Sequence, residues 1–253
     1  MKRERAYAIR GQGWPRPPSG ARPREERLRR DERDGAAETG CRRRRPFKLK
    51  PRGRFIVLDG PDGAGKTTQV ALLAASLRRA GLRVVRAKDP GATPAGRAIR
   101  RILLHGRDGS IAPDTELFLY LAARAELSAR VIAPALARGD WVVCDRYSPS
   151  TVAYQGAAAG RNPAAVERLC RAAEGGVRPD LVVILDLPVE AGLRRMRRRL
   201  DRMERKGAAF LRAVRRSFLA QARRNRWPVV RADGTPKEVG QRVRTAVRGR
   251  LDR

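Results

Sequence analysis

One stretch near residue 60 has the residue types and the spacing of a phosphate-binding loop. It reads, in order, Gly60, Pro61, Asp62, Gly63, Ala64, Gly65, Lys66, Thr67 and Thr68. The backbone N–H groups of such a glycine-rich loop can surround a polyphosphate. The lysine adds a positive charge for the β- and γ-phosphates, and the hydroxyl of Thr67 can bind Mg²⁺. The pattern predicts a polyphosphate site, and a chance glycine-rich turn is the alternative.

The segments on either side of this loop are those that it requires. Residues 55–58 form a short apolar run that is typical of a buried parallel strand. Residues 68–79 carry apolar side chains at helical spacing, and Ala80-Gly81 then gives a stop signal. Because the motif should follow a strand and open a helix, the flanks favour the phosphate-binding interpretation.

The rest of the chain, from residue 54 to residue 253, predicts a single α/β domain. Apolar runs predict further strands at 83–87, 141–144, 181–185 and 229–230. Helices are expected at 94–104, 114–137 (kinked or split at Pro134), 163–173, 188–203 (one long helix or a helix pair), 210–224 and 236–251. Strands that alternate with helices predict a three-layer fold, in which helices cover both faces of a parallel sheet.

Charged residues follow several of the expected strands. Asp89 ends the second strand, and Asp145 and Arg146 end the third. Ligands of open α/β sheets bind beyond the carboxyl ends of the strands, so these groups should meet the phosphate loop there. Asp145 can hold Mg²⁺ directly or through water, and Arg146 can bridge phosphates. The alternative is an Asp–Arg ion pair that only fixes the turn.

Composition excludes several classes of site. The chain has 253 residues, three cysteines (Cys41, Cys144 and Cys170) without a C-x-x-C pair, and a single histidine, His105. A disulfide framework, a zinc cluster or a Ser-His-Asp triad is therefore not expected, and unpaired cysteines suit the cytoplasm. No apolar run is long enough to span a membrane. Catalysis should rest on electrostatic stabilisation by lysine and arginine.

Residues 1–53 differ from the rest, because they are rich in Arg and Pro and contain few aliphatic side chains. Such a segment cannot bury enough apolar surface to fold, so we expect a disordered basic extension. The whole chain has a formal net charge of +32. Binding of nucleic acid is one interpretation, although the extension lacks aromatic residues interleaved with its basic ones for base stacking. Arginines spread over solvated faces are the other.

Several motifs together resemble thymidylate kinases. GPDGAGKTTQ at 60–69, DRYSPSTVAYQG at 145–156 and DRME at 201–204 occur in the order of that family, and DPGATPAGRAIR at 89–100 is similar to its second signature. The resemblance covers about residues 54–250. It implies a P-loop kinase that transfers the γ-phosphoryl group of Mg-ATP to dTMP, works in the cytoplasm and forms a homodimer. Thr68 would support the donor phosphates from the helix N-terminus.

The resemblance also implies an acceptor site. Asp62 would reach toward the acceptor sugar, Arg124 would donate to O4 of thymine, and the other candidates are Tyr120 (stacking on the base), Arg146, Ser150, Thr151 and Tyr154 (beside the sugar, against a ribose 2′-hydroxyl). Tyr120 and Arg124 share one helix face, being four residues apart. Ordinary half-buried tyrosines are the alternative for the two aromatic positions.

A short lid is expected at about residues 193–207. This chain has Gly63 where some family members carry an arginine, and the resemblance then implies that lid arginines, such as Arg198 or Arg202, act in catalysis. A solvated basic helix is the alternative. Lys88-Asp89 replaces the Arg-Glu that is usual in the family. A kinase of altered or broad deoxynucleoside monophosphate specificity is therefore a second hypothesis, and a P-loop protein that binds nucleic acid is a distant third.

Overall fold

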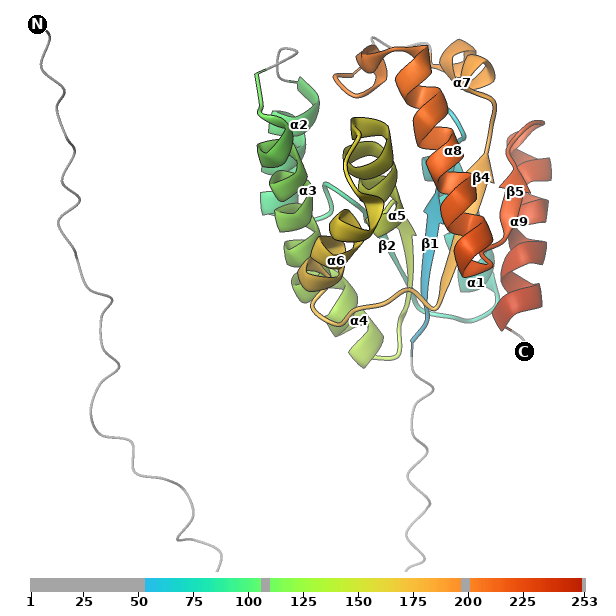
Figure 1. The fold of residues 1–253 in the computed structure, drawn as a ribbon. Coiled ribbons are helices and arrows are strands. Elements are labelled where there is room, and N and C mark those ends of the chain that lie inside the picture. The colour runs from blue at the N-terminus through green and yellow to red at the C-terminus, as the bar shows by residue number, and fades with distance from the viewer. Residues whose placement is uncertain (1–52, 106–109, 197–200, 252–253) are drawn as a thin grey trace, which may run out of the picture. The chain divides into compact units, whose positions relative to one another are not determined.

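The structure is a computed structural model that describes residues 53–105, 110–196 and 201–251. Its sheet is five-stranded, and every pairing in it is parallel. The strand order is β2-β3-β1-β4-β5, with β1 at Phe55–Asp59, β2 at Val84–Lys88, β3 at Trp141–Asp145, β4 at Leu181–Asp186 and β5 at Val229–Arg231 (Figure 1). The predicted α/β class and parallel sheet are confirmed, and each strand begins or ends within two residues of its expected position.

Helices cover both faces of this sheet (Figure 1). The α-helices are α1 (Lys66–Arg79), α2 (Pro94–His105), α3 (Pro113–Leu127), α4 (Ala133–Ala137), α5 (Ser148–Thr151), α6 (Pro163–Ala173), α7 (Val189–Arg195), α8 (Ala208–Asn225) and α9 (Pro236–Leu251). Short π- or 3₁₀-helical turns lie between some of them: η1 (Ser128–Ile132), η2 (Val152–Gly156), η3 (Ala157–Ala159) and η4 (Glu204–Lys206).

The core has two parts, one on each face of the sheet. Successive side chains of a strand point to opposite faces, and β1 contributes Phe55 and Val57 to one part and Ile56 and Leu58 to the other. The first part packs against α3, α4 and α8, and the second against α1 and α9. Because β1 is wholly buried in the middle of the sheet, the loop that follows it begins from a fixed point.

The helical segments differ from expectation in two places, whereas the break expected near Pro134 is present. The helix expected at 114–137 is interrupted by η1, just before Pro134, which has no N–H to continue the backbone ladder. The helix expected at 188–203 ends at Arg195, and residues 197–200 lie outside the described residues. The short helical segment 148–156 was not predicted.

Two further sequence predictions concern regions or properties beyond this fold. The extension expected to be disordered lies, up to residue 52, outside the described part of the chain. Among the residues that the structure describes, no helix has both the length and the apolar character needed to cross a membrane.

Candidate active site

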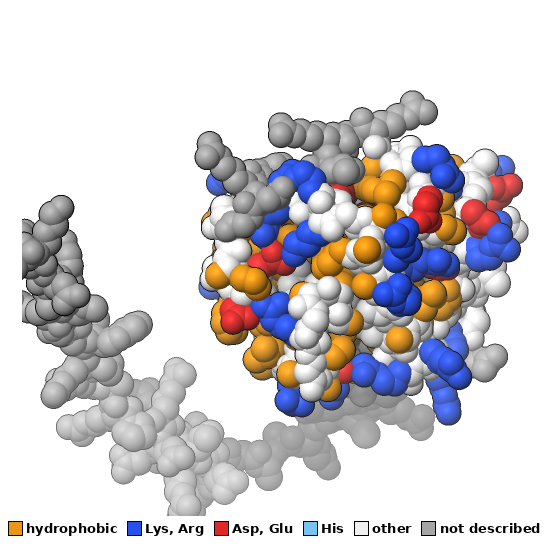
Figure 2. Space-filling model, turned by 45° about the horizontal axis from the view of Figure 1, so that its top comes forward, with side chains coloured by type: hydrophobic (Ala, Val, Ile, Leu, Met, Phe, Trp, Pro, Cys, Tyr) orange, Lys and Arg blue, Asp and Glu red, His pale blue; other side chains and the backbone are white. Residues whose placement is uncertain are grey.

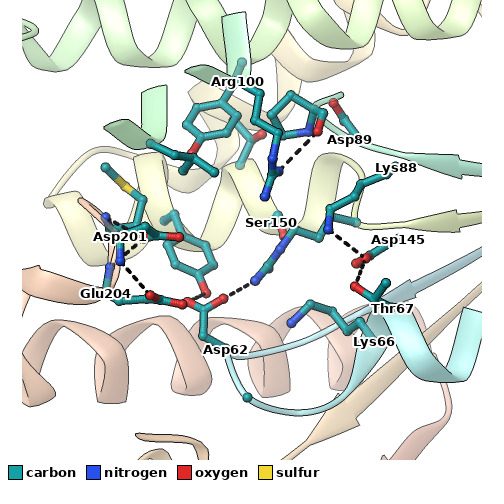
Figure 3. A pocket seen from close by; sticks show the side chains of 18 of the residues that line it. Asp62, Lys66, Thr67, Lys88, Asp89, Arg100, Asp145, Ser150, Asp201 and Glu204 are labelled. Atoms are coloured by element: carbon teal, nitrogen blue, oxygen red, sulfur yellow. Dashed lines mark hydrogen bonds and ion pairs between the residues drawn. The ribbon is translucent and has the colours of Figure 1, made fainter. Parts of the chain in front are cut away.

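A pocket of about 230 Å³ lies at the carboxyl edge of the sheet, between the loop after β1 and the segments that follow β2 and β3. Figure 3 shows Lys66, Thr67 and Asp145 at one end of it, Asp201 and Glu204 at the other, and Asp62 between them. The predicted residues that line it are Asp62, Gly63, Gly65, Lys66, Thr67, Thr68, Tyr120, Arg124, Asp145, Arg146, Ser150, Thr151 and Tyr154. The structure thus brings the two predicted halves of the site together.

The loop at 60–65 leads directly into the first turn of α1. Gly65 caps this helix in the left-handed conformation (φ 80°), and the first turn holds no acidic residue. Gly60 has a φ of 140°, and a Cβ atom there would meet the carbonyl oxygen of Leu185 at 2.2 Å. The loop therefore needs glycine at both positions, and it leaves the positive end of the α1 dipole open to an anion.

Lys66 is buried under this loop. Its Nζ donates to the carbonyl oxygens of Gly60 at 3.0 Å and Pro61 at 2.6 Å. Burial, followed by repulsion from Arg146, lowers the pKa of Lys66 to about 8, against the attraction of nearby aspartates. The lysine is thus a buried cation whose Nζ is held by backbone carbonyl oxygens, and it would gain from an anionic ligand.

Thr67 and Asp145 place two oxygens side by side at the mouth of the loop. The Thr67 hydroxyl donates to Oδ2 of Asp145 at 2.5 Å, and Lys88 Nζ lies 3.6 Å from the same oxygen. Burial opposes ionisation of Asp145, but Lys66 and Arg146 outweigh it and hold the pKa of this carboxyl below its usual range. Asp145 is therefore a carboxylate at neutral pH, as a cation ligand must be.

Asp59, the last residue of β1, holds the segment after β3 in place. Its fully buried carboxylate accepts from the backbone N–H groups of Gly60 (2.9 Å), Tyr147 (3.2 Å) and Ser150 (3.1 Å), and from the Ser150 hydroxyl (2.7 Å). Sequence reasoning missed this residue. The only available signal was a carboxylate at the end of an apolar run, and nothing local indicated its partners.

Arg146 spans the space between the loop and this segment. Its guanidinium donates to the Gly60 carbonyl oxygen at 3.2 Å and the Ser150 hydroxyl at 2.9 Å, and it is ion-paired with Asp62. The residue has a φ of 69°, which costs a non-glycine residue about 1–2 kcal/mol. Tyr154 donates to the other oxygen of Asp62 at 2.5 Å. Asp62 and Arg146 therefore form one polar cluster at the centre of the pocket.

Arg124 is almost wholly buried and lies deeper in the pocket. Its Nε donates to Oδ2 of Asp89 at 2.7 Å, and its Nη2 donates to the Thr151 hydroxyl at 2.9 Å. Burial opposes its charge, but Asp89 outweighs burial and raises the pKa of Arg124. Tyr120 lies one helical turn earlier on the same wall, where burial raises its pKa. The predicted base-binding residues are thus adjacent, although Ser150 is engaged with Asp59 and Arg146.

The structure describes one of the two arginines predicted for the lid. Arg198 lies outside the described residues. Arg202 is described, and it does not line the pocket. Its side chain is buried and ion-paired with Glu116 at 2.6 Å, behind the pocket wall. The structure thus places Arg202 where its guanidinium does not reach the phosphate loop.

Arg100 lines the pocket and was not predicted. It extends from α2 and donates to the Pro90 carbonyl oxygen at 3.2 Å, and Figure 3 shows it opposite Asp62. Burial, followed by repulsion from Arg146, lowers its pKa. Two guanidiniums that face one pocket indicate an anionic ligand between them. The spacing of arginines at 97, 100 and 101 gave no means to choose this one.

Gly63 and Gly192 bring the loop against α7. A Cβ atom on Gly63 would lie 2.5 Å from the Gly192 carbonyl oxygen, and one on Gly192 would lie 2.5 Å from the Asp62 carbonyl oxygen. Contacts this short do not occur in folded proteins, so neither position has room for a side chain. Helix α7 is therefore packed backbone to backbone on the phosphate loop.

The parallel sheet, the phosphate loop and the facing Asp–Arg cluster define a P-loop phosphotransferase. The family model for thymidylate kinase matches residues 58–243. A thymidylate kinase of Pseudomonas putida (strain GB-1) is 51% identical over 174 residues, which cover 68% of this chain and 83% of that protein. One from Parasynechococcus marenigrum (strain WH8102) is 43% identical over 206 residues, covering 79% of this chain and 99% of that protein. The chain belongs to the thymidylate kinase family, as predicted, and is a kinase of nucleotide biosynthesis.

Proposed function

We propose that this protein transfers the γ-phosphoryl group of ATP to dTMP, which gives dTDP and ADP. The observation that carries this proposal is the arrangement of Lys66 and Arg146 in one pocket with Arg124 and Tyr120. The first two suit the phosphates of a donor and an acceptor, and the last two suit a pyrimidine base. Family membership supports the same reaction.

The donor would lie along the loop at 60–68. Its phosphates would accept hydrogen bonds from the backbone N–H groups at the start of α1. Lys66 would then donate to phosphate oxygens in place of the Gly60 and Pro61 carbonyl oxygens. Such a transfer needs positioning and charge neutralisation more than covalent chemistry. A buried lysine with a lowered pKa suits this role, because the free-energy cost of removing its charge from water is already included in folding.

The acceptor would occupy the opposite half of the pocket. Asp62, Arg146 and Arg100 surround the place where its phosphate would meet the donor, and Tyr154 holds Asp62 through a hydrogen bond. Arg124 would donate to O4 of thymine, because Asp89 and Thr151 fix its guanidinium from behind. Tyr120 would stack on the ring.

Thr67 and Asp145 suit Mg²⁺. Their oxygens are hard ligands, and the lowered pKa keeps Asp145 ionised. Within the described ranges, no group of three or more His, Cys, Asp or Glu side chains could hold a metal ion, so phosphates and water would supply the other ligands. When bound, the ion would neutralise charge on the β- and γ-phosphates.

An acceptor panel tests this function. ADP release is measured with dTMP, dUMP, dCMP, dGMP and UMP at equal concentrations. We expect kcat/KM for dTMP to exceed that for dCMP at least about hundredfold. Cytosine has an amino group in place of O4, so the buried guanidinium of Arg124 would face another donor and lose its hydrogen bond. Equal turnover of several acceptors would support the altered-specificity hypothesis instead. Absence of dTMP turnover would refute the proposal.

The lowered pKa of Lys66 predicts that ATP binding weakens at alkaline pH. Below pH 8 the lysine is already charged, whereas above pH 8 it must take up a proton when the phosphates bind. The Kd for Mg-ATP should therefore be flat up to about pH 8 and then rise by up to about tenfold per pH unit. Calorimetry at pH 7.5–9.5 in two buffers of different ionisation enthalpy measures both Kd and proton uptake. Lys66→Arg is the control, since an arginine stays charged over this range.

We also propose that the protein is a homodimer. Three large apolar side chains are exposed on neighbouring helices: Ile102 on α2 (51% exposed), Phe118 on α3 (58%) and Leu169 on α6 (40%) (Figure 1). Apolar groups that lie together on a surface often mark an interface. Sedimentation equilibrium should give a dimer mass that Phe118→Glu reduces to the monomer mass; a monomeric wild type would refute the proposal.

The location that we propose is the cytoplasm. Cys144 and Cys170 are buried free thiols, which suit a reducing compartment.

Figure 2 shows Lys and Arg side chains distributed over the visible face, with Asp and Glu among them. This distribution favours the solvated-arginine interpretation of the charge for the described domain.

A further inference from the structure

A buried ion pair lies directly behind one wall of the pocket. The side chains of Arg202 and Glu116 are 5% and 6% exposed, and Nη2 of the arginine lies 2.6 Å from Oε2 of the carboxylate. Nε of Arg202 also donates to the Leu103 carbonyl oxygen at 2.9 Å. Asp201 and Met203, on either side of Arg202, line the pocket, and Arg202 itself points away from it. The arginine therefore anchors a strip of pocket wall without touching the space in front of it.

Glu116 joins this strip to α3 and η2, two of the elements that carry the proposed acceptor-binding residues. It lies on α3 four residues before Tyr120, so the two share one helix face. Its Oε1 accepts a hydrogen bond from Nε2 of Gln155 at 2.9 Å, and Gln155 follows Tyr154 in η2. Lys206 Nζ lies 3.5 Å from the same oxygen. One carboxylate thus connects α3, η2 and the segment 201–206.

The strip itself is held in a fixed shape. Oδ1 of Asp201 accepts from the backbone N–H groups of Met203 at 3.0 Å and Glu204 at 3.1 Å. In return, Oε2 of Glu204 accepts from the N–H of Asp201 at 2.8 Å. These reciprocal bonds form a capping box. Because the strip has a defined shape, its position against Tyr120 depends on where Arg202 is anchored.

We propose that Arg202 is a positioning residue for the acceptor, and not a group that contacts the transferred phosphoryl. Through Glu116 it sets the distance between the 201–204 strip and Tyr120, and so determines how closely the acceptor base is enclosed. Because leaving either charge of this buried pair without its partner is costly, Arg202 stays beside Glu116 and the strip keeps one position. The proposal rests on the proposed function, in which dTMP is the acceptor.

Steady-state kinetics of Arg202→Met, Arg202→Lys, Glu116→Gln and the double variant Arg202→Met/Glu116→Gln test this assignment. We expect KM for dTMP to rise about tenfold in Arg202→Met and in Glu116→Gln, with kcat within about threefold of wild type and KM for ATP unchanged. The double variant should be no worse than either single variant, because the two residues act as one unit. Arg202→Lys should restore part of the loss, since it keeps the charge but not the bond to Leu103.

Asp114→Asn is the matched control, because it removes a carboxylate from the same turn of α3 that is 78% exposed and is ion-paired with Arg161. It should leave both KM values unchanged. Thermal melts select the variants that are folded, and Glu116→Gln and Arg202→Lys carry the test if Arg202→Met does not fold.

Two outcomes would overturn the proposal. A fall in kcat of about a hundredfold or more in Arg202→Met, with KM for dTMP unchanged, would identify a catalytic contact instead. Folded variants with a lowered melting temperature and wild-type KM and kcat would show a purely structural ion pair. A wild-type protein that does not turn over dTMP would instead refute the proposed function, so the two failures are distinguishable.

Discussion

Lys66→Met should reduce kcat by at least about a thousandfold, which corresponds to about 4 kcal/mol of transition-state stabilisation. The lysine is buried under the loop, and its bonds to the Gly60 and Pro61 carbonyl oxygens hold it where we propose that the donor phosphates bind. Methionine has similar length and no charge. Because the charge is costly to bury, its loss should leave the melting temperature unchanged or raise it. Single-turnover rates at saturating Mg-ATP and dTMP measure the effect.

The matched control for this variant is Lys237→Met, which removes a lysine from the exposed surface of α9. It should retain wild-type kcat. A Lys66→Met protein that is folded and within about tenfold of the wild-type rate would contradict the role given to Lys66.

Arg146→Ala should lower kcat about a hundredfold to a thousandfold. The guanidinium contacts the Gly60 carbonyl oxygen, Ser150 and Asp62 at once, so it spans the boundary between the proposed donor and acceptor halves. A lysine cannot reproduce this planar set of donors, so Arg146→Lys should recover little of the rate. Both variants keep a Cβ atom at a positive φ, so the backbone strain is shared with wild type and does not obscure the comparison.

Arg215→Ala provides the control for Arg146. Arg215 on α8 makes a bidentate ion pair with Asp186 at 2.7 and 2.9 Å, and neither residue lines the pocket. Its loss should leave kcat unchanged. Near-wild-type kcat in Arg146→Ala, with a raised KM for both substrates, would indicate that Arg146 only binds phosphate and does not stabilise the transition state.

The parts of the site that were predicted are those whose signal is local in sequence. The loop from Gly60 to Thr67 carries its own motif, and the apolar run before it fixes the strand. Asp89 and Asp145 were placed because each follows an apolar run, and parallel strands end at a common edge.

The parts that were not predicted depend on partners far apart in the chain. Asp59 binds the backbone of Tyr147 and Ser150, which are 88 and 91 residues away. Held by Asp59 through the N–H of Ser150, the segment 148–156 forms helical turns for which the sequence had given no prediction. Arg202 looked like one more lid arginine until the structure placed it beside Glu116, 86 residues earlier.

The close packing of Gly63 on Gly192 has a consequence for how this enzyme could change in evolution. An arginine at position 63 would place its Cβ 2.5 Å from the carbonyl oxygen of Gly192 in α7. No single substitution can therefore add an arginine to the loop at this position, because α7 would first have to shift. A substitution at Gly192 is excluded in the same way, because any side chain there would meet the Asp62 carbonyl oxygen. A side chain at either position therefore requires the backbone of the loop and that of α7 to move apart. A protein with this packing is expected to keep glycine at both positions.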